Sequence, residues 1–537
     1  MGFACNEPEA GVVKLFIRTN QVGYLPNDFK QAVVFSASDL AGKSYAIVNN
    51  ASNRTVTEGV LGNVVGEWGN FKYQYNVNFS NVRTPGNYRI EVEKTKSYSF
   101  AIGDNVYKGI TDSLLTFLRV QRCGPTNPHL HGLCHNYDSP RVEGDPGAGS
   151  VDVTGGWHDA GDYTKFLSTI AGTTYLLLFT YEFDREAAEY DGNGNQTPDI
   201  LEEARVGIDW LLRANYSGTK LISQVQDLRD HSVGWRKPEE DPLQYDRPAF
   251  LGEGKNLIGM FTAALALGSK IWKERFYDEE FSTRLKNVAE NVYKSYPSAP
   301  DVDKNPSGMY QEKGFAGKLA LGAVELYTIT KNPQYLSDAT ALATTAGSDY
   351  WWSFGDMNAL AHYRIAQYKP EYSRYIQNNL IAFETNRSKS IYGEGTAFSW
   401  GTTNTFLGIT LQAMLYKKLT GNRDYNPLMV AQRDYVLGNN PWGVSFIYNI
   451  GSRFTRYFHS QIAYFNGGYF PGGVAAGPAP QEVLKNYTIQ RENTSYDQFN
   501  SVDVRYYDDR NDYITNEPTT MTNATAIFVF THMKKMF

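Results

Sequence analysis

Two aspartates three residues apart are the first feature of this sequence that could perform chemistry. Asp159 and Asp162 lie in the stretch GGWHDAGDY, residues 155–163, among glycines. Glycine lets the backbone approach another surface closely, and this glycine pattern indicates a turn rather than the interior of a helix. Two carboxylates held on one turn are a costly arrangement unless water, a metal or a substrate uses them. The stretch therefore predicts a functional site.

A second cluster consists of residue types that bind metals. It has the spacing Cys-x10-Cys-His-x22-His and comprises Cys123, Cys134, His135 and His158. Two thiolates and two imidazoles suit a tetrahedral zinc site, which is structural because no ligand position stays open. His129 or His131 could replace one ligand, and the alternative is that these side chains simply fill space in the core. Because His158 precedes Asp159, zinc at this site would orient the aspartate pair.

A third stretch, DGNGNQTPDILEE, has the oxygen-bearing side chains of a calcium loop. These are Asp191, Asn193, Asn195, Asp199 and Glu202, with the glutamate at the twelfth loop position. Gln196 occupies the sixth position, where such loops use glycine, so the pattern departs from a regular calcium-binding loop. The same residue types also form turns and cap helices. The sequence leaves calcium binding and plain turn formation open.

The composition is that of a folded protein with more than one domain. The chain has 537 residues, of which 42% are hydrophobic and 20% charged, and its formal net charge is −6. This charge disfavours nucleic acid or an acidic membrane surface as a partner. The aromatic content of 14% indicates a large core, exposed rings that stack on sugars, or both. No apolar run of membrane-spanning length occurs, and three cysteines are too few for a disulfide scaffold.

The elements that must position these residues change type along the chain. Up to residue 103, short runs such as KQAVVFSA, YQYNVNFSNV and GNYRIEVE alternate with turn residues, which is typical of a β-sandwich. Beyond that point, long segments with helical periodicity take over, such as ILEEARVGIDWLLRA and NLIGMFTAALALGSKIW. We expect a β-sandwich over residues 13–103 and a large all-α domain over residues 104–537.

Several motifs resemble, in the same order, those of the family 9 glycoside hydrolases. YYDDRNDYITNEPTTMTNAT, which contains Glu517, resembles the acid-bearing motif of that family, and GGWHDAGDY resembles its base-bearing motif. RTNQVGYLPNDFKQAVV is similar to the start of the immunoglobulin-like module that often precedes the catalytic domain. DHSVGWRKPEE, YVLGNNPWGVSF and GGVAAGP add further matches. The resemblance extends over residues 14–537.

The resemblance implies a fold, a reaction and three catalytic residues. The fold is an (α/α)6 barrel preceded by a small all-β immunoglobulin-like sandwich, and the reaction is hydrolysis of β-1,4-glucans with inversion. Asp162 corresponds to the general base, Asp159 to its partner that positions the water, and Glu517 to the general acid. Inversion needs one carboxylate and one carboxylic acid about 6.5–9.5 Å apart, with a water between them. Glu517 must therefore keep its proton near neutral pH.

The stretch SRFTRYFHSQ departs from the family pattern, which has Pro-His-x-Arg at this point. His459 keeps the place of the histidine that contacts substrate, whereas Gln461 stands where the family has arginine. Glutamine lacks the cationic fork with which arginine binds sugar hydroxyls, so substrate preference becomes uncertain. Arg453 or Arg456 could supply a replacement, and the alternative is that the change is neutral.

Further sugar contacts are expected from a histidine and from aromatic rings. His231 lies in DHSVGW, and Trp235, Trp400 and Tyr513 are the rings that we expect to bind substrate. Other tryptophans in or beside the matched motifs, any of which could equally belong to the core, are Trp157, Trp351, Trp352 and Trp442.

The sequence therefore predicts an endo-acting β-glucanase for cellulose, mixed-linkage or decorated glucan. One alternative is an exo-acting enzyme of the same fold that releases glucose, cellobiose or glucosamine from chain ends. The others are a carbohydrate-binding protein without catalysis and a zinc hydrolase, although four protein ligands would leave that zinc no open site.

The expected environment and partners follow from the same substrate. We expect a monomer outside the cytoplasm (secreted, periplasmic or on the outer surface) that acts on a β-glucan and has no organic cofactor. Cys5, in MGFACNEPEA, has the small residue before it and the polar stretch after it that a processed bacterial lipoprotein would show, or it belongs to a plain N-terminal tail. We expect the sandwich to support the barrel rather than to bind sugar.

Overall fold

The N-terminal part of the chain forms two β-sheets that share a core. The structure is a computed structural model and describes residues 14–304 and 308–536. One sheet has the order β1 (Leu15–Arg18), β3 (Gln31–Ser36), β7 (Phe71–Asn78), β6 (Gly66–Trp68). The other has the order β2 (Gly23–Tyr24), β10 (Phe100–Ile102), β8 (Gly86–Val92), β4 (Ser44–Asn49), β5 (Arg54–Val60), with β9 (Thr95–Lys96) on β8. Buried residues of both sheets, including Val34, Ile47 and Ile90, form one cluster, which confirms the predicted sandwich.

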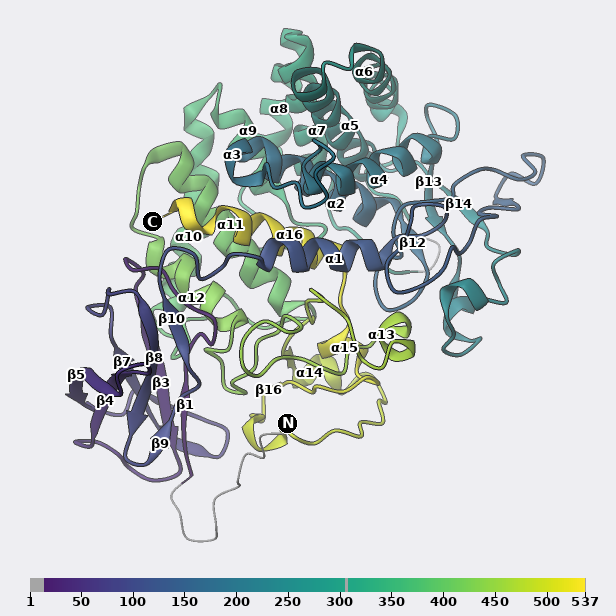
Figure 1. Ribbon diagram of the computed structural model, residues 1–537. Coiled ribbons are helices and arrows are strands. Elements are labelled where there is room, and N and C mark those ends of the chain that lie inside the picture. Colours follow the sequence, from purple (N-terminus) through teal and green to yellow (C-terminus); the bar gives the residue numbers. More distant parts are fainter. Residues whose placement is uncertain (1–13, 305–307, 537) are drawn as a thin grey trace.

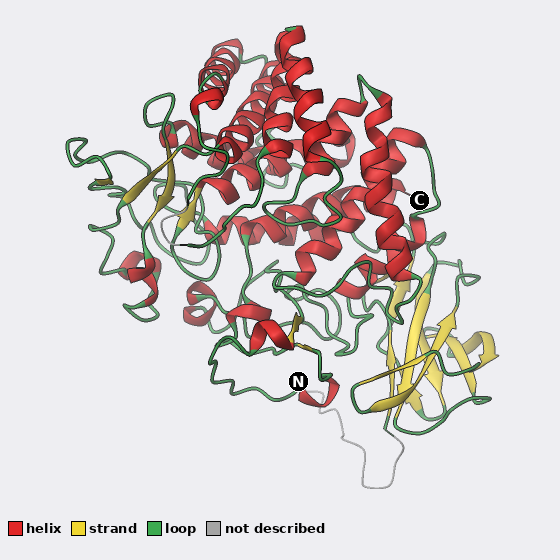
Figure 2. Ribbon diagram, turned by 180° about the vertical axis from the view of Figure 1, so that it is seen from behind, coloured by secondary structure: helices red, strands yellow, loops and turns green. Residues whose placement is uncertain are grey.

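The rest of the chain is dominated by long helices arranged as an inner ring with an outer layer (Figures 1 and 2). The inner helices are α2 (Leu167–Phe183), α5 (Lys255–Phe276), α7 (Ala316–Thr330), α9 (Asn358–Ala366), α11 (Thr402–Thr420) and α16 (Thr520–His532). Each contacts the next, and α16 contacts α2, so the ring closes. The outer helices are α1 (Ile110–Gln121), α4 (Asp199–Ala214), α6 (Glu279–Tyr293), α8 (Pro333–Ala346), α10 (Ser373–Arg387) and α12 (Asn426–Val436). This is the expected (α/α)6 barrel.

The inner helices are buried on nearly every side, which their sequences explain. Every residue of α2 except Glu182 is buried, and two of its threonines pair their hydroxyls by bonding back to the preceding turn of the helix. Thr174 Oγ1 donates to the carbonyl of Ile170 at 2.7 Å, and Thr180 Oγ1 donates to that of Leu176 at the same distance. A helix whose surface is largely apolar on every side is expected inside a domain.

Shorter elements occupy the loops around the barrel. A sheet of order β11 (Val142–Glu143), β14 (Ala249–Gly252), β13 (Leu221–Val225), β12 (Lys165–Phe166) lies beside α2, and β15 (Ala479–Pro480) pairs with β16 (Val504–Arg505). The short α-helices are α3 (Arg185–Ala188), α13 (Gln461–Phe465), α14 (Gln481–Leu484) and α15 (Tyr513–Asn516). The 3-10 helices are η1 (Leu228–His231), η2 (Pro238–Glu240), η3 (Tyr296–Ser298), η4 (Pro370–Tyr372), η5 (Asp497–Phe499) and η6 (Met533–Met536).

Polar contacts join the sandwich to the helical part. The Asp28 carboxylate pairs with Arg433 at 2.9 Å, with both side chains fully buried. Gln21 Nε2 donates to the carbonyl of Gly443 at 2.7 Å, and Trp68 Nε1 donates to that of Phe499 at 2.6 Å. These contacts fix the sandwich against α12 and the loops that follow it. Within the two described ranges, no helix combines the length and apolar character needed to cross a bilayer.

Candidate active site

The aspartate turn lies directly before the inner helix α2, and backbone bonds hold its shape. The Asp159 N–H donates to the carbonyl of Thr164 at 3.0 Å, and the Thr164 N–H donates to Asp162 Oδ1 at 3.0 Å. Gly155 and Gly156 have φ angles of 86° and 68°. Residues other than glycine rarely adopt positive φ angles. The two glycines therefore allow the backbone to turn sharply before the aspartates.

Glu517 reaches the same turn from the other end of the chain. It follows α15 and precedes α16, the inner helix that contacts α2. Glu517 Oε1 accepts a hydrogen bond from the N–H of Gly161, the residue before Asp162, at 3.2 Å. The Thr520 N–H donates to the carbonyl of Asp159 at 3.0 Å. Two neighbouring inner helices therefore bring together the three carboxyl groups that the sequence placed in one site.

The surroundings push the pKa values of two of these carboxyl groups in opposite directions. Burial, together with the negative charges of Asp162 and Asp159, raises the pKa of Glu517 to about 8. Burial also opposes ionisation of Asp162, but the hydrogen bond from His231 outweighs it and lowers the pKa of Asp162. Near neutral pH, Glu517 therefore holds a proton and Asp162 is charged. Acid–base catalysis requires one protonated and one ionised group of this kind.

His231, which the sequence suggested as a sugar contact, bonds directly to Asp162. Its Nε2 donates to Asp162 Oδ2 at 2.7 Å, and this bond raises the pKa of His231 to about 9. The imidazole side chain is 43% exposed, so it also faces solvent. At neutral pH the pair is an imidazolium and a carboxylate, which favours the ionised form of Asp162.

Sequence reasoning missed Tyr310, whose hydroxyl donates to Asp159 Oδ2. Asp159 is buried, and burial raises its pKa to about 6 although the bonds from Thr169 and Tyr310 act in the opposite direction. The Tyr310 ring packs edge-on against Phe166 at 5.0 Å, which fixes it beside the turn. Tyr310 lies in PSGMYQEKG, between α6 and α7, and this stretch has no motif that could have indicated it.

His459 and Gln461 both contact the aspartate turn through the backbone. A β-carbon on Gly161 would lie 2.1 Å from the carbonyl oxygen of His459, and the Gln461 N–H donates to the carbonyl of Gly161 at 3.1 Å. Gln461 is 5% exposed, and its Oε1 accepts from the N–H of Arg236 at 3.0 Å. Its side chain therefore links two backbone segments of the site, a use that the sequence did not suggest.

The aromatic rings divide into a group that is exposed or half-buried and a group that is fully buried. Trp400 is 43% exposed and lies 5.9 Å from the ring of Tyr513, which in turn lies 5.6 Å from the ring of His459. Trp235 continues this row, 5.3 Å from His459 on the other side. The buried group is Trp157, Trp352 and Trp442, each with no exposed surface. These three belong to the core and cannot stack on substrate, and Trp351 is half-buried.

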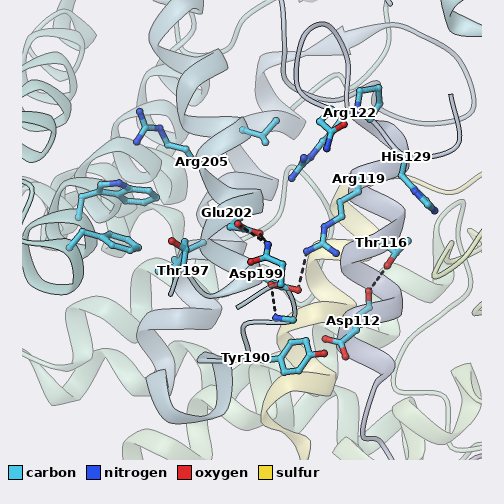
Figure 3. Close-up of a pocket in the computed structure, with 18 of the residues that line it drawn as sticks. Asp112, Thr116, Arg119, Arg122, His129, Tyr190, Thr197, Asp199, Glu202 and Arg205 are labelled. Carbon is cyan, nitrogen blue, oxygen red and sulfur yellow. Dashed lines mark hydrogen bonds and ion pairs between the residues drawn. The ribbon is translucent and has the colours of Figure 1, made fainter. Parts of the chain in front are cut away.

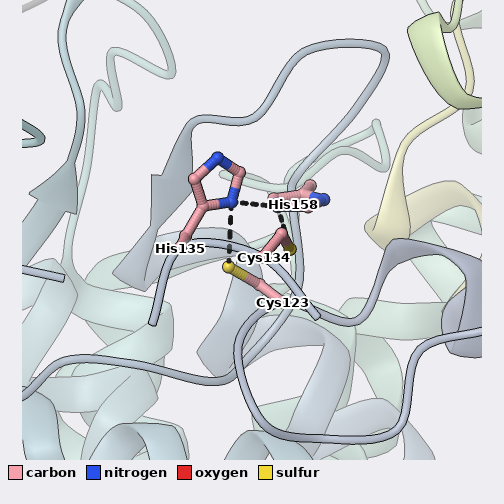
Figure 4. A group of neighbouring side chains, drawn as sticks. All are labelled: Cys123, Cys134, His135 and His158. Carbon is pink, nitrogen blue, oxygen red and sulfur yellow. Dashed lines mark hydrogen bonds between the residues drawn. The ribbon is translucent and has the colours of Figure 1, made fainter. Parts of the chain in front are cut away.

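The four metal-binding residues predicted from their spacing form one buried group (Figure 4). Their ligand atoms all lie within 4.8 Å of one another. His135 Nδ1 lies 3.1 Å from His158 Nε2, and Cys123 Sγ lies 3.6 Å from His135 Nδ1. Ligand atoms of a tetrahedral zinc site are separated by roughly 3.3–3.8 Å, so the group fits a metal ion. His135 Nε2 donates to Asp241 at 3.0 Å, as outer carboxylates do at metal-bound histidines.

The pKa values of two of the four residues also fit a metal, whereas the bond to Cys123 and burial raise the pKa of Cys134. Burial opposes protonation of His135, but the charge of Cys123 and the bond to Asp241 prevail and raise the pKa of its imidazole. Burial opposes ionisation of Cys123, but the hydrogen bond from Cys134 and the charge of Lys165 prevail and lower the pKa of the Cys123 thiol well below its ordinary value. Burial lowers the pKa of His158 to about 4. A thiolate and a neutral imidazole are the forms that bind metal. His129 and His131, the suggested substitutes, are not part of the group.

The predicted calcium loop lies beside a cavity of about 1050 Å³ between α1, α4 and α5 (Figure 3). Asp191 accepts from the backbone N–H groups of residues 194, 195 and 196. Asn193 Nδ2 donates to both oxygens of Glu202, and the Asn195 amide also donates to that carboxylate. Asp199 pairs with Arg119 at 3.0 Å. These contacts are turn and loop contacts, and calcium binding stays a prediction. Neither Asp159, Asp162 nor Glu517 lines this cavity.

Comparison with known proteins agrees with this arrangement. The family model described as "Glycosyl hydrolase family 9" matches residues 107–530, and that described as "Cellulase N-terminal ig-like domain" matches residues 15–97. Endoglucanase D of Acetivibrio thermocellus is 24% identical over 513 residues, which cover 86% of this chain and 78% of that protein. The xyloglucan-specific endo-beta-1,4-glucanase BoGH9A of Bacteroides ovatus is 24% identical over 584 residues, covering 98% and 95%. The crystal structure of a metagenome-derived glycoside hydrolase family 9 endoglucanase has a TM-score of 0.83 and 26% identity, covering 97% of this chain and 99% of that one.

Proposed function

This chain belongs to glycosyl hydrolase family 9, and on that basis we propose that it hydrolyses β-1,4-glucosidic bonds within β-glucans. The two relatives above are named endoglucanases, one of them specific for xyloglucan. A row of rings runs from the exposed Trp400 through the half-buried Tyr513 to the half-buried Trp235. It passes His459, which touches the aspartate turn. Rings on both sides of His459 suit an internal stretch of a glucan, because each flat sugar face can stack on one of them.

We propose that the three carboxyl groups act as base, partner and acid of an inverting reaction. The ionised Asp162 takes a proton from the attacking water, and Asp159 holds that water in place. Glu517 gives its proton to the departing glycosidic oxygen while the water oxygen bonds to the anomeric carbon from the opposite face. The products leave Asp162 protonated and Glu517 ionised, and exchange with solvent resets both. The observation that carries this assignment is the hydrogen bond between Glu517 and the turn that holds both aspartates.

Substitution of single carboxyl groups tests the assignment. Glu517→Gln and Asp162→Asn should each lower kcat on a soluble β-glucan by roughly 10²–10⁴-fold, the range that general acids and bases contribute. Glu482→Gln is the matched control, because Glu482 is exposed on α14, and it should leave kcat unchanged. Unchanged turnover in Glu517→Gln would remove the proposed acid. Viscosity measured during the reaction separates modes of attack, since an endo-acting enzyme lowers it early and an exo-acting one does not.

We further propose that Cys123, Cys134, His135 and His158 hold a structural zinc ion. The four side chains are buried and supply two sulfur and two nitrogen ligands, so they leave no position for a substrate or water. His158 adjoins Asp159, and a metal there would fix the start of the aspartate turn. Metal analysis of the purified protein should find about one zinc per chain, and exchange for cobalt should leave kcat unchanged. Loss of rate on exchange, without loss of folding, would instead support a zinc hydrolase.

Three finer proposals complete this account. The loop over residues 191–202 binds calcium in this proposal. Added calcium should then raise the Tm of the protein, and Asp191→Ala should abolish that rise. We propose that the boundary between sandwich and barrel lies at residues 103–104, and the position of this stretch between β10 and α1 supports it. The enzyme acts outside the cytoplasm, where polymeric β-glucan is found. Cys5, the suggested lipid anchor, lies outside the described residues.

A further inference from the structure

A guanidinium group lies between two exposed tyrosine rings next to His459. The Arg510 Cζ is 5.1 Å from the ring centre of Tyr464 and 5.9 Å from that of Tyr457. Both tyrosines are more than 40% exposed, and Tyr464 also packs edge-on against Trp235 at 5.3 Å. Among residues 14–304 and 308–536, no carboxylate lies within ion-pairing distance of Arg510. The two rings therefore hold the Arg510 guanidinium in position, and its N–H groups remain available to a ligand.

The backbone of Arg510 is fixed to the catalytic end of the site. His459 Nδ1 donates to the Arg510 carbonyl at 2.7 Å, and the His459 N–H donates to the carbonyl of Asn516, the residue before Glu517. Desolvation lowers the pKa of His459, so the ring is neutral at pH 7 and this bond defines its tautomer. Two hydrogen bonds through His459 therefore connect Arg510 to Asn516, the residue before the proposed acid.

The other residues suggested for this substrate contact have other partners. Gln461, at the position where the family has arginine, is buried and bonded to the N–H of Arg236. Arg453 Nε donates to the hydroxyl of Tyr496 at 2.9 Å. Arg456 is exposed and stacks on Phe454 at 5.0 Å. None of these side chains contacts the rings beside His459.

We propose that Arg510 is the substrate-binding cation of this enzyme and takes over the task that position 461 cannot perform. Its guanidinium fork binds hydroxyl groups of the glucosyl unit next to the cleaved bond, while Tyr464 and Trp235 offer apolar faces to the same part of the chain. Arginine suits this role because its donors are planar and rigidly spaced, matching two adjacent hydroxyls. This inference rests on the proposed function of the site.

Steady-state kinetics and calorimetry of Arg510→Met test the inference. Methionine keeps an unbranched side chain but removes the charge and all donors. With cellohexaose, KM should rise roughly tenfold or more while kcat changes less than about threefold, because the contact is made with bound substrate as well as in the transition state. Arg456→Met, which removes another arginine that stacks on a ring, is the matched control and should behave as the wild type.

Direct binding separates this inference from the proposed function. In a Glu517→Gln background, adding Arg510→Met should weaken cellohexaose binding by the same factor, whereas adding Arg456→Met should not. If Arg510→Met fails to fold, Arg510→Lys keeps the charge without the fork and should show a smaller loss of affinity. Affinity equal to that of the Arg456→Met protein would overturn the role of Arg510, even with Glu517 essential. Full turnover by Glu517→Gln would overturn the proposed function instead.

Discussion

Replacing Gly161 with alanine is the most informative single change, because this residue lies against Glu517, His459 and Gln461. Its N–H bonds to Glu517 Oε1, and its carbonyl accepts from the N–H of Gln461. A β-carbon at this position would lie 2.1 Å from the carbonyl oxygen of His459 and 3.1 Å from Glu517 Oε1. The first contact is with backbone, so no side-chain rotation can relieve it.

The size of the expected effect follows from these distances. Ordinary van der Waals contact begins at 3.4 Å, so the His459 backbone and the aspartate turn must separate by more than 1 Å. A displacement of about 1 Å at reacting groups can cost roughly 10²-fold in rate. Overpacking of this kind costs about 1–3 kcal/mol of stability, which a protein of this size tolerates. We therefore expect Gly161→Ala to fold and to lose roughly 10²-fold or more in kcat.

The assay compares kcat on a soluble β-glucan, circular dichroism and Tm for Gly161→Ala and Gly314→Ala. Gly314 is the matched control, because a β-carbon there would have no heavy atom within 4 Å and the residue has no left-handed φ. The control should match the wild type in all three measurements. A folded Gly161→Ala protein with kcat within about threefold of the wild type would refute the reasoning, since the turn would then not need to approach the two other segments closely.

Three further predictions concern the titration of the site and the metal group. Since Glu517 must be protonated to act and its pKa is about 8, kcat/KM should decline as the pH rises through about 8; a rate that keeps rising to pH 10 would contradict this. His231→Ala removes the hydrogen bond that lowers the pKa of Asp162 and a positive charge that lowers the pKa of Glu517. Both limbs of the pH profile of kcat/KM should therefore move to higher pH. An acidic limb that does not move would count against the pairing of His231 with Asp162. Cys123→Ser should reduce the zinc content to near zero and lower Tm by roughly 5 °C or more, as measured by metal analysis and thermal unfolding; unchanged Tm with the metal lost would show that it does not support the fold.

Much of the fold could be predicted from the sequence because its patterns are local. Strand stretches such as KQAVVFSA and GNYRIEVE became β3 and β8, and ILEEARVGIDWLLRA became α4. The Cys and His residues were also predictable as a group, because both residue types are scarce in this chain and two of each fall close together in the sequence. These signals depend on residues close together in sequence or on residue types with few other uses.

Contacts between distant segments were not predictable in the same way. The Tyr310 hydroxyl meets Asp159 across 151 positions of sequence, and nothing around Tyr310 marks it. The side chain of Gln461, which the sequence placed at the substrate, also accepts a hydrogen bond from the backbone of Arg236, 225 positions away. Trp157 and Trp400 both stand near matched motifs, yet Trp157 is fully buried with its Nε1 on Glu203 and Trp400 is exposed. Whether a ring stacks on substrate or fills the core depends on packing around it, which the neighbouring sequence does not define.

The stereochemistry of the first product tests the account most directly. If a water molecule held at Asp162 attacks opposite a leaving group protonated by Glu517, the new reducing end must be the α-anomer. Proton NMR recorded in the first minutes of cellohexaose hydrolysis, before mutarotation, should show the α-anomeric signal appear first and the β signal follow. Initial release of the β-anomer would mean that the configuration is retained, and the proposed roles of these carboxyl groups would then be wrong.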